Sequence, residues 1–301
     1  MTTQKKVCAV VGVGPGNGAA LGRRFAKEGY AVALLARTTA MSESLARSLP
    51  DARAYACDVS DAEQVAGVFA AIEHEMGPVA TLVYNPGSGK GPPWGTVEEI
   101  EPTALEAAFR VSALGLLLVA QKVIPQMKAQ GGGNVVVIGA TASRRGVART
   151  AGFAPAKAAQ RSLAESMARH LWPQKIHVSL IIVDGVVDLP RTRALLKDKP
   201  DDFFIAPDAL ADVAFHLTVQ PPSAWSFEVE ARPFKETWCR GQREPRDTRP
   251  PSRARGWRNA ASRETRLAIP PLRRRLGPDA PAAIRSSSGP KRTLSKDMTL
   301  L

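Results

Sequence analysis

The sequence predicts a single α/β domain built on a doubly wound parallel sheet, followed by a basic tail. Three observations lead to this prediction. Short apolar runs alternate with amphipathic helical segments from Lys6 to about Trp238. The runs are apolar throughout, which is typical of strands buried on both faces. A glycine-rich turn follows the first run, and strand–helix–strand alternation is the usual way to connect parallel strands.

Each element in the first half of the chain has its own pattern. The run Val7–Val11 is short, apolar and bounded by glycine. The following helix carries Leu21 and Phe25 four residues apart, and therefore on one face. Between 61 and 76, apolar residues recur at i, i+3, i+4 and i+7, the repeat of a helix face. We expect strands at 7–11, 30–36, 52–57 and 79–83, and helices at 17–28 and 61–76.

The second half continues the alternation. A long helical segment precedes two further apolar runs, and a last helix places Leu210, Val213, Ala214 and Leu217 on one stripe. A final apolar segment can close the sheet. We expect helices at 102–129, 152–171 and around 210–217, and strands at 134–138, 177–183 and 225–229.

The positive charge of the chain belongs to its tail. The whole sequence has a formal net charge of +13, but residues 239–301 contain 16 Lys and Arg against 5 Asp and Glu. This leaves the domain, residues 1–238, nearly neutral. The tail also contains 8 prolines and a single aromatic residue, so it cannot bury enough apolar surface to offset its ordering entropy. We therefore expect residues 239–301 to be disordered.

Three interpretations of this Arg- and Pro-rich tail remain open. A basic arm could bind RNA or a membrane surface. A solvated tail without specific function is the interpretation we favour. An out-of-frame extension of a GC-rich gene would also yield Arg, Pro, Ala and Ser, and resequencing the coding region around Trp238 tests it.

Cysteine and histidine usage points to a protein of a reducing compartment with no bound metal. Three scattered cysteines exclude a disulfide framework and a cysteine-based zinc site. The sequence shows neither an apolar run of about 18–20 residues nor a signal peptide. We therefore expect a cytoplasmic protein without a membrane partner. The histidines lack metal-ligand spacing and are expected on helix surfaces or strand edges: His74, His170, His177 and His216.

The turn after the first strand has the composition of a phosphate-binding loop. It contains Gly12, Gly14, Gly16 and Gly18, and Asn17 begins the helix. Glycines let backbone N–H groups approach a pyrophosphate closely, and the helix N-terminus adds partial positive charge. A tight turn without a ligand is the alternative. The position between the first strand and the first helix favours dinucleotide binding.

These motifs resemble those of the short-chain dehydrogenase/reductase family over residues 6 to about 238. The family's Gly-xxx-Gly-x-Gly pattern is matched by Gly12, Gly16 and Gly18, and its acidic residue after the third strand by Asp58. Its Asn-Asn-Ala-Gly turn is half matched by 84–87. The resemblance implies a Rossmann-type sheet and cofactor contacts from Gly12, Gly14, Gly16, Asn17, Gly18, Asp58, Val59, Asn85, Gly87, Lys157, Gly185 and Val187.

The end of the second strand indicates which dinucleotide is preferred. A carboxylate there would bind the ribose 2′-OH and repel a 2′-phosphate. This chain has Arg37 and Thr38 instead, which can neutralise a phosphate and donate hydrogen bonds to it. A solvated loop arginine is the alternative. We expect NADP(H) to be favoured over NAD(H).

The resemblance breaks down at the catalytic positions. The family uses a Ser, a Tyr thirteen residues later and a Lys four beyond it, together with an Asn in the long helix. Lys157 matches, but Phe153 stands at the Tyr position, Ala140 at the Ser position and Ser112 at the Asn position. The phenol normally moves a proton to or from the substrate oxygen, and phenylalanine has no such proton. Asp184 also replaces the proline of the family's turn after the sixth strand.

Other residues could contribute to a rebuilt site. Ser143, a weak candidate, and Thr141 lie on the loop beside the Ser position, whereas the neighbours of Tyr84 suggest a scaffold role. Residues 188–205 would form a lid over a small-molecule substrate, or a mobile solvated loop. The resemblance implies a homodimer or tetramer that pairs through the long helix and the lysine-bearing helix.

Three functional hypotheses follow. The first is an NADP(H)-dependent oxidoreductase of the short-chain type that acts on a carbonyl or alcohol substrate through a divergent centre. The second is a dinucleotide-binding pseudoenzyme that senses or scaffolds without turnover, which Phe153 and Ala140 favour. Nucleic-acid binding through the tail is the weakest.

Overall fold

Seven parallel strands form the central sheet of the part of the chain that the computed structural model describes, residues 5–87 and 94–235. Their order is β3-β2-β1-β4-β5-β6-β9, and every neighbouring pair is parallel. The order reverses between β1 and β4, and ligands of such sheets bind at this switch point, outside the carboxyl ends of the strands. The strands are Val7–Val11 (β1), Ala31–Ala36 (β2), Ala52–Ala56 (β3), Val79–Tyr84 (β4), Gly133–Ala140 (β5), Ile176–Val183 (β6) and Glu228–Ala231 (β9).

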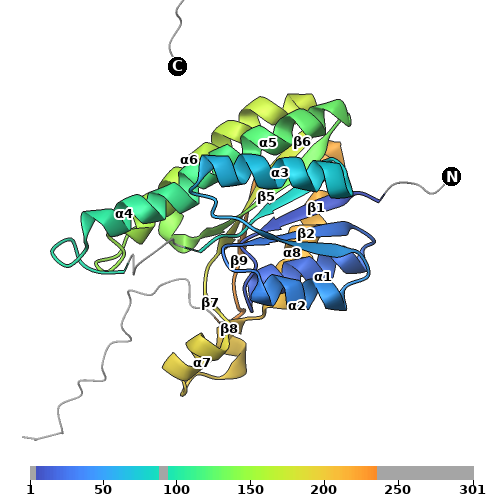
Figure 1. Ribbon diagram of the computed structural model, residues 1–301. Coiled ribbons are helices and arrows are strands. Elements are labelled where there is room, and N and C mark those ends of the chain that lie inside the picture. Colours follow the sequence, from blue (N-terminus) through green and yellow to red (C-terminus); the bar gives the residue numbers. More distant parts are fainter. Residues whose placement is uncertain (1–4, 88–93, 236–301) are drawn as a thin grey trace, which may run out of the picture. The chain divides into compact units, whose positions relative to one another are not determined.

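Helices cover both faces of the sheet (Figure 1). One face carries α1 (Asn17–Lys27), α2 (Ala40–Ser48) and α8 (Pro207–Thr218), and the other carries α3 (Ala62–Met76), α4 (Pro102–Phe109), α5 (Gly115–Ala129) and α6 (Phe153–Leu171). The sheet separates two apolar cores. Phe69 and Leu171 lie in the core under α3, α5 and α6, and Phe25 and Leu210 in the core under α1 and α8. All residues of β1 are buried, as its continuous apolar run predicts.

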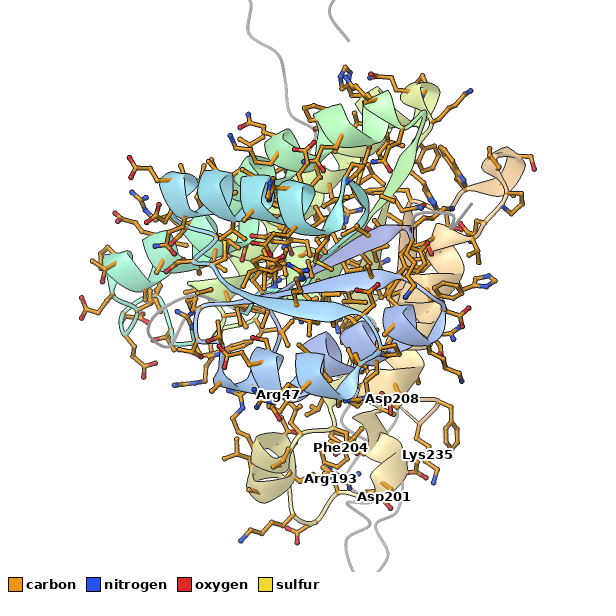
Figure 2. The ribbon with its side chains drawn as sticks, turned by 45° about the vertical axis from the view of Figure 1, so that its right-hand side comes forward. Arg47, Arg193, Asp201, Phe204, Asp208 and Lys235 are labelled. Carbon is orange, nitrogen blue, oxygen red and sulfur yellow. The ribbon has the colours of Figure 1, made fainter. Side chains whose placement is uncertain are left out.

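The segment that includes the predicted lid, residues 188–205, forms a substructure outside the main sheet (Figure 1). It contains β7 (Val186–Val187), α7 (Pro190–Leu195) and β8 (Phe204–Ile205), and β7 pairs with β8. Arg193 holds it together: its guanidinium donates to both carboxylate oxygens of Asp188 at 2.7 and 2.8 Å and to Asp201 at 2.6 Å. The same group lies 4.1 Å from the centre of the Phe204 ring, and Figure 2 shows Arg193 with Phe204 and Asp201.

The sheet and the alternation confirm the predicted fold class, but three details differ. Helix α2 was not predicted. The long helix contains one turn of π-helix at Arg110–Leu114, between α4 and α5. The last strand begins at Glu228 rather than at residue 225, and the ring of Trp225, before the strand, stacks on His177 with centroids 4.7 Å apart.

The prediction for His177 was wrong. It lies on β6, between β5 and β9, and only 2% of its surface is exposed. Its Nε2 contacts the carbonyl oxygen of Ser226 at 2.9 Å, and burial lowers the pKa of the imidazole. An alternating polar position in an interior strand can therefore be buried when aromatic side chains cover it.

Two further sequence predictions concern membranes and the tail. The helical segment Pro102–Ala129 has a mean hydropathy of 1.6 over its most apolar window, 44% of which is buried. By length and composition it could span a membrane, but a core helix of an α/β protein has the same composition. The predicted tail, residues 239–301, lies outside the described residues.

Candidate functional site

The glycine-rich loop between β1 and α1 has a shape that requires glycine at two positions. Gly12 has a φ of +90°, and a Cβ on it would lie 2.6 Å from the backbone nitrogen of Pro86. A Cβ on Gly18 would lie 2.5 Å from the carbonyl oxygen of Gly12. A Cβ on Gly14, by contrast, would meet no described atom within 4 Å. The loop is therefore tightly packed on the protein side and open at Gly14.

Hydrogen bonds from both neighbouring strands fix this loop. The backbone nitrogens of Gly12 and Val13 donate to the carbonyl oxygen of Leu35 at 2.9 and 3.0 Å. The side-chain amide of Asn85 donates to the carbonyl oxygen of Gly12 at 2.9 Å. At the start of α1, the buried Oδ1 of Asn17 has no hydrogen-bond partner among the described residues. Buried polar atoms are normally satisfied, so this oxygen marks a place for a ligand or a water molecule.

The residues predicted to bind the adenosine half lie at the ends of β2 and β3. Arg37 and Thr38 are exposed directly after β2. The carboxylate of Asp58 accepts from the backbone nitrogen and the hydroxyl of Ser60, at 3.0 and 2.6 Å, and Val59 is buried. Because β2 and β3 pair in parallel, these residues share one edge of the sheet with the glycine-rich loop.

Lys157 is buried in neutral surroundings. Its Nζ donates to the side-chain oxygen of Gln160 at 3.0 Å and to the carbonyl oxygen of Ile138 at 3.4 Å. It lies 5.9 Å from the centre of the Phe153 ring, on the same face of α6. Burial lowers the pKa of Lys157 to about 8. The lysine is therefore a buried amine that can be either charged or neutral near physiological pH.

An aromatic pair occupies the expected position of the phenol. The Phe153 ring packs on Trp94 with centroids 4.4 Å apart. Backbone hydrogen bonds join Gly95 to Arg149 and Ala151, so the segment at Trp94 is fastened to the loop that leads into α6. Trp94 remains 52% exposed. The two rings form an apolar wall beside Lys157.

The candidate hydroxyls make internal hydrogen bonds. The Ser143 hydroxyl donates to the carbonyl oxygen of Ala140 at 2.7 Å, within the 3₁₀ turn Thr141–Ser143. The Thr141 hydroxyl donates to the carboxylate of Asp184. The hydroxyl of Ser112, in the π-helical turn packed against α6, is buried and has no partner among the described residues. The structure thus brings Ala140, Phe153 and Lys157 together around the carboxyl end of β5, but no phenol.

Tyr84 has the scaffold position that its sequence context predicted. It is fully buried, and its hydroxyl donates to the carbonyl oxygen of Val111, in the π-helical turn, at 2.5 Å. Burial raises the pKa of Tyr84 well above its ordinary value. Gly115 makes room for this hydroxyl, because a Cβ there would lie 2.5 Å from the Tyr84 oxygen.

The turn after β6 connects the lid to the glycine-rich loop. The carbonyl oxygen of Val187 accepts from the Thr192 hydroxyl at 2.6 Å. The Leu189 side chain covers Gly16, where a Cβ would lie 2.3 Å from a Leu189 methyl group. Gly185 lies between Asp184 and β7, and Gly87 is exposed after β4. Asn85 and Gly87 thus follow the carboxyl end of β4, and Gly185 and Val187 follow that of β6.

Sequence reasoning missed three contributors to this region: Trp94, Gln160 and Arg232, whose guanidinium donates to the carboxylate of Asp184. Gln160 is i+3 from Lys157 on α6, a helical neighbour, so its spacing could have suggested the contact. The contacts of Trp94 and Arg232 join segments far apart in sequence, and no local pattern signals them. Within the described ranges, no cluster of three His, Cys, Asp or Glu side chains could hold a metal ion.

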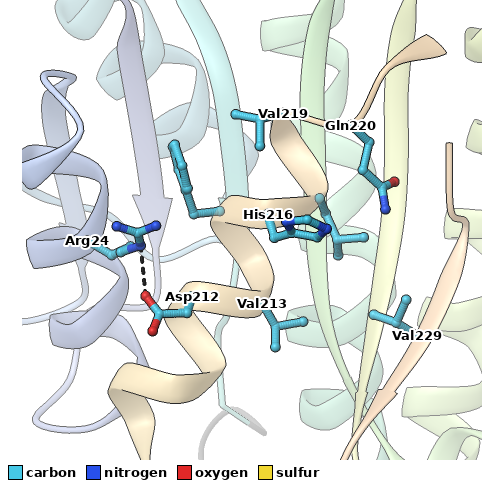
Figure 3. Close-up of a pocket in the computed structure, with 9 residues that line it drawn as sticks. Arg24, Asp212, Val213, His216, Val219, Gln220 and Val229 are labelled. Atoms are coloured by element: carbon cyan, nitrogen blue, oxygen red, sulfur yellow. Dashed lines mark ion pairs between the residues drawn. The ribbon is translucent and has the colours of Figure 1, made fainter. Parts of the chain in front are cut away.

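Two cavities lie in the described part of the chain. One, of about 300 Å³, lies beside the start of α6 and is lined by Ser143, Arg145 and Thr150 among others. The other, of about 490 Å³, lies between α8 and β9 near the end of α1. Figure 3 shows Arg24 and Asp212, which line it and form an ion pair with an N–O distance of 2.8 Å. The second cavity lies on the opposite side from the glycine-rich loop, which follows the carboxyl end of β1. Because the helices run antiparallel to the strands, the cavity near the C-terminal ends of α1 and α8 lies at the amino ends of the strands.

A doubly wound parallel sheet with a glycine-rich turn at its switch point defines a Rossmann-type α/β protein. The sequence pattern of the family described as short chain dehydrogenase matches residues 6–199. The chain belongs to this oxidoreductase family.

Curated relatives and solved structures agree with this assignment. The chain is 28% identical over 186 residues to 3-oxoacyl-(acyl-carrier-protein) reductase MabA of Mycobacterium tuberculosis, covering 62% of this chain and 71% of the relative. It is 26% identical over 194 residues to the human 3-oxoacyl-(acyl-carrier-protein) reductase, covering 64% and 80%.

Among solved structures, a short-chain dehydrogenase from Rhodopseudomonas palustris superposes with a TM-score of 0.65 at 28% identity, covering 76% of this chain and 99% of that one. A metagenomic short-chain oxidoreductase in complex with NADP superposes with a TM-score of 0.65 at 25% identity, covering 77% and 98%.

Proposed function

We propose that the protein is an NADP(H)-dependent oxidoreductase that acts on a carbonyl or alcohol substrate through a divergent catalytic centre. The observation that carries this proposal is the glycine-rich loop, which is fixed by Leu35 and Asn85 and open at Gly14, next to Arg37 at the end of β2. NADP in the metagenomic relative's structure supports the choice of cofactor. Family membership supports the reaction class.

The residues present fit a dinucleotide. The space in front of Gly14 admits a pyrophosphate, to which backbone N–H groups at the start of α1 would donate. The unpartnered Asn17 oxygen, an acceptor, could take a hydrogen bond only from a donor such as a hydroxyl or a water molecule. Arg37 and Thr38 would hold a 2′-phosphate, and the end of β2 carries no carboxylate that would repel it. Asp58 and Val59 would hold the adenine, while Asn85, Gly87, Lys157, Gly185 and Val187 would hold the nicotinamide half. A bound nicotinamide would supply or accept the hydride.

The chain's own residues would orient the substrate rather than supply a phenolic proton. Trp94 and Phe153 form an apolar wall, and the Nζ of Lys157 lies 5.9 Å from the centre of the Phe153 ring. Because its pKa is about 8, Lys157 can give a proton to the substrate oxygen, directly or through water. Ser143 could do so only after breaking its bond to the carbonyl oxygen of Ala140. Positioning would therefore be the main catalytic resource.

A pseudoenzyme that binds a dinucleotide without turnover is the second candidate. The apolar pair Trp94–Phe153 favours it, because it fills the position where the family has its phenol. A small-molecule substrate under the lid, a homodimer or tetramer, and a cytoplasmic location belong to both proposals.

Binding isotherms for NADPH and NADH test the cofactor proposal. We expect NADPH to bind at least tenfold more tightly than NADH, and Arg37→Ala to remove most of this preference, since one charge-assisted contact to phosphate is worth about 1.5–3 kcal/mol. Arg169→Ala, on the exposed end of α6, is the matched control and should change neither constant. Tighter binding of NADH to the unmodified protein would overturn the NADP(H) assignment.

A further inference from the structure

A network of charged side chains joins three segments at the carboxyl edge of the sheet. The carboxylate of Asp184, directly after β6, accepts from the Thr141 hydroxyl and from the guanidinium of Arg232. Arg232 follows β9 and also donates to Glu230. The network thus ties the loop after β5, the turn after β6 and the segment after β9 to one another.

The network extends to the loop and the helix that carry the candidate catalytic positions. Arg144, on the loop after β5, donates to Glu228 at 2.7 Å and also to Glu230. Arg161, on α6 one turn beyond Lys157, donates to Glu228 at 2.5 Å. Despite burial, these two arginines lower the pKa of Glu228. Positive and negative charges are equal in number, so the network is neutral as a whole.

The centre of this network, the pair of Arg232 with Asp184, is largely buried, and burial favours one fixed arrangement of the two side chains. The side chains of Arg232 and Asp184 are 15% and 13% exposed. A charge-assisted hydrogen bond at such a site is strong, and the loss of one partner leaves the other charge buried. Exposed ion pairs, such as Arg23 with Asp208 on α1 and α8, lack this property.

The turn after β6, which contains Gly185, packs between the lid and the segment after β9. A Cβ on Gly185 would lie 2.8 Å from the ring of Pro233 and 3.1 Å from the side chain of Ile205. A side chain at Gly185 would therefore clash with both neighbours. The position of this turn is set by Asp184 on one side and by Pro233 and Ile205 on the other.

We infer that Asp184 is a positioning residue for the nicotinamide end of the site. The family has proline at this position, and proline fixes a turn through its ring. Asp184 fixes the same turn through its bonds to Thr141 and Arg232. This inference rests on the proposed dinucleotide function, and it adds the segment after β9 to the parts of the chain that shape the site.

A comparison of two ligands distinguishes this positioning role from a general loss of protein stability, because both ligands have the adenosine end and only one has the nicotinamide. NADPH contacts both ends of the proposed site, whereas adenosine 2′,5′-bisphosphate lacks the nicotinamide. We expect Asp184→Asn and Arg232→Met to weaken NADPH binding by about tenfold or more, while binding of the bisphosphate changes by less than twofold. Asp208→Asn is the matched control, because it removes an exposed ion-paired carboxylate elsewhere, and it should change neither constant.

Thr141→Val provides a second test if the charged-residue variants fail to fold. It removes one hydroxyl at nearly constant volume and should weaken NADPH binding alone, whereas Thr141→Ser, which keeps the hydroxyl, should restore it. Unchanged NADPH binding in Asp184→Asn and Thr141→Val, or an equal loss of both ligands, would overturn the inference. If the unmodified protein bound neither ligand, the proposed function itself would fail instead.

Discussion

Replacing Lys157 with methionine tests the electrostatics at the centre of the site. Lys157 has a pKa of about 8 in the folded protein, against an ordinary value of 10.5, and burial is the cause. Between these two pH values the unfolded chain binds more protons than the folded protein. The contribution of Lys157 to the free energy of unfolding therefore rises as the pH rises through this interval. Methionine has a similar length and no charge, so Lys157→Met removes this contribution.

The magnitude follows from the size of the shift. One pKa unit corresponds to about 1.4 kcal/mol, so the full interval is worth about 3 kcal/mol. At pH 7 the variant gains stability by removing a buried charge and loses some by leaving the Gln160 oxygen without its donor, a cost of about 1–3 kcal/mol. The second effect does not depend on pH. The stability of the variant relative to the unmodified protein should therefore fall by about 2–3 kcal/mol between pH 7 and pH 10.

Urea unfolding at pH 7, 8, 9 and 10 measures this difference, because other titrating groups contribute equally to both proteins. Lys122→Met, at an exposed position of α5, is the control and should show a pH-independent difference. A pH-independent difference for Lys157→Met as well would refute the reasoning, since it would mean that Lys157 keeps its ordinary pKa in the folded protein.

Four further substitutions have distinct expected outcomes. Phe153→Tyr should create carbonyl reductase activity or raise it by about 10²–10⁴-fold, measured on a panel of aldehydes and ketones, and the addition of Ala140→Ser should raise it further. The substitution should cost little stability because the volume hardly changes. If activity does not increase, proton supply is not the limiting factor. Tyr84→Phe should lower the free energy of unfolding by about 1–2 kcal/mol, measured in urea, because it removes a buried hydrogen bond. Gly18→Ala should lower the melting temperature because its Cβ would meet backbone atoms, whereas Gly14→Ala should weaken NADPH binding without affecting stability. Equal melting temperatures of the two variants would contradict the loop geometry.

Local patterns were sufficient to predict the sheet and most of its helices. Strands such as β1 are buried on both faces, so their sequences are apolar throughout, and α3 shows its buried face as a 3.6-residue repeat. Helix α2 has only nine residues and fully buries only the side chain of Ser42, while Leu45 and Ala46 are partly buried against the core, so its apolar face is a short signal in the sequence. Strands β7 and β8 have two residues each, too few for any periodicity.

The candidate site was predictable only where its residues are close in sequence. The glycine-rich loop and the Phe153–Lys157 spacing lie within single segments. The packing of Trp94 on Phe153, and the hydrogen bonds of Asp184 to Thr141 and Arg232, join residues that are 43 to 59 positions apart in the sequence. Such contacts depend on how the strands are ordered in the sheet, which one sequence does not reveal.

Transfer of deuterium from NADPH in which both C4 hydrogens are replaced by deuterium tests the central claim most directly. The unmodified protein would be incubated with the labelled NADPH and a panel of aldehydes and ketones, and the alcohol products analysed by mass spectrometry. An NADP(H)-dependent oxidoreductase must place deuterium on the carbinol carbon of at least one product, at a rate that Phe153→Tyr increases. Tight NADPH binding with no deuterium in any product, for the unmodified protein and for Phe153→Tyr with Ala140→Ser, would contradict the proposal and identify a dinucleotide-binding pseudoenzyme.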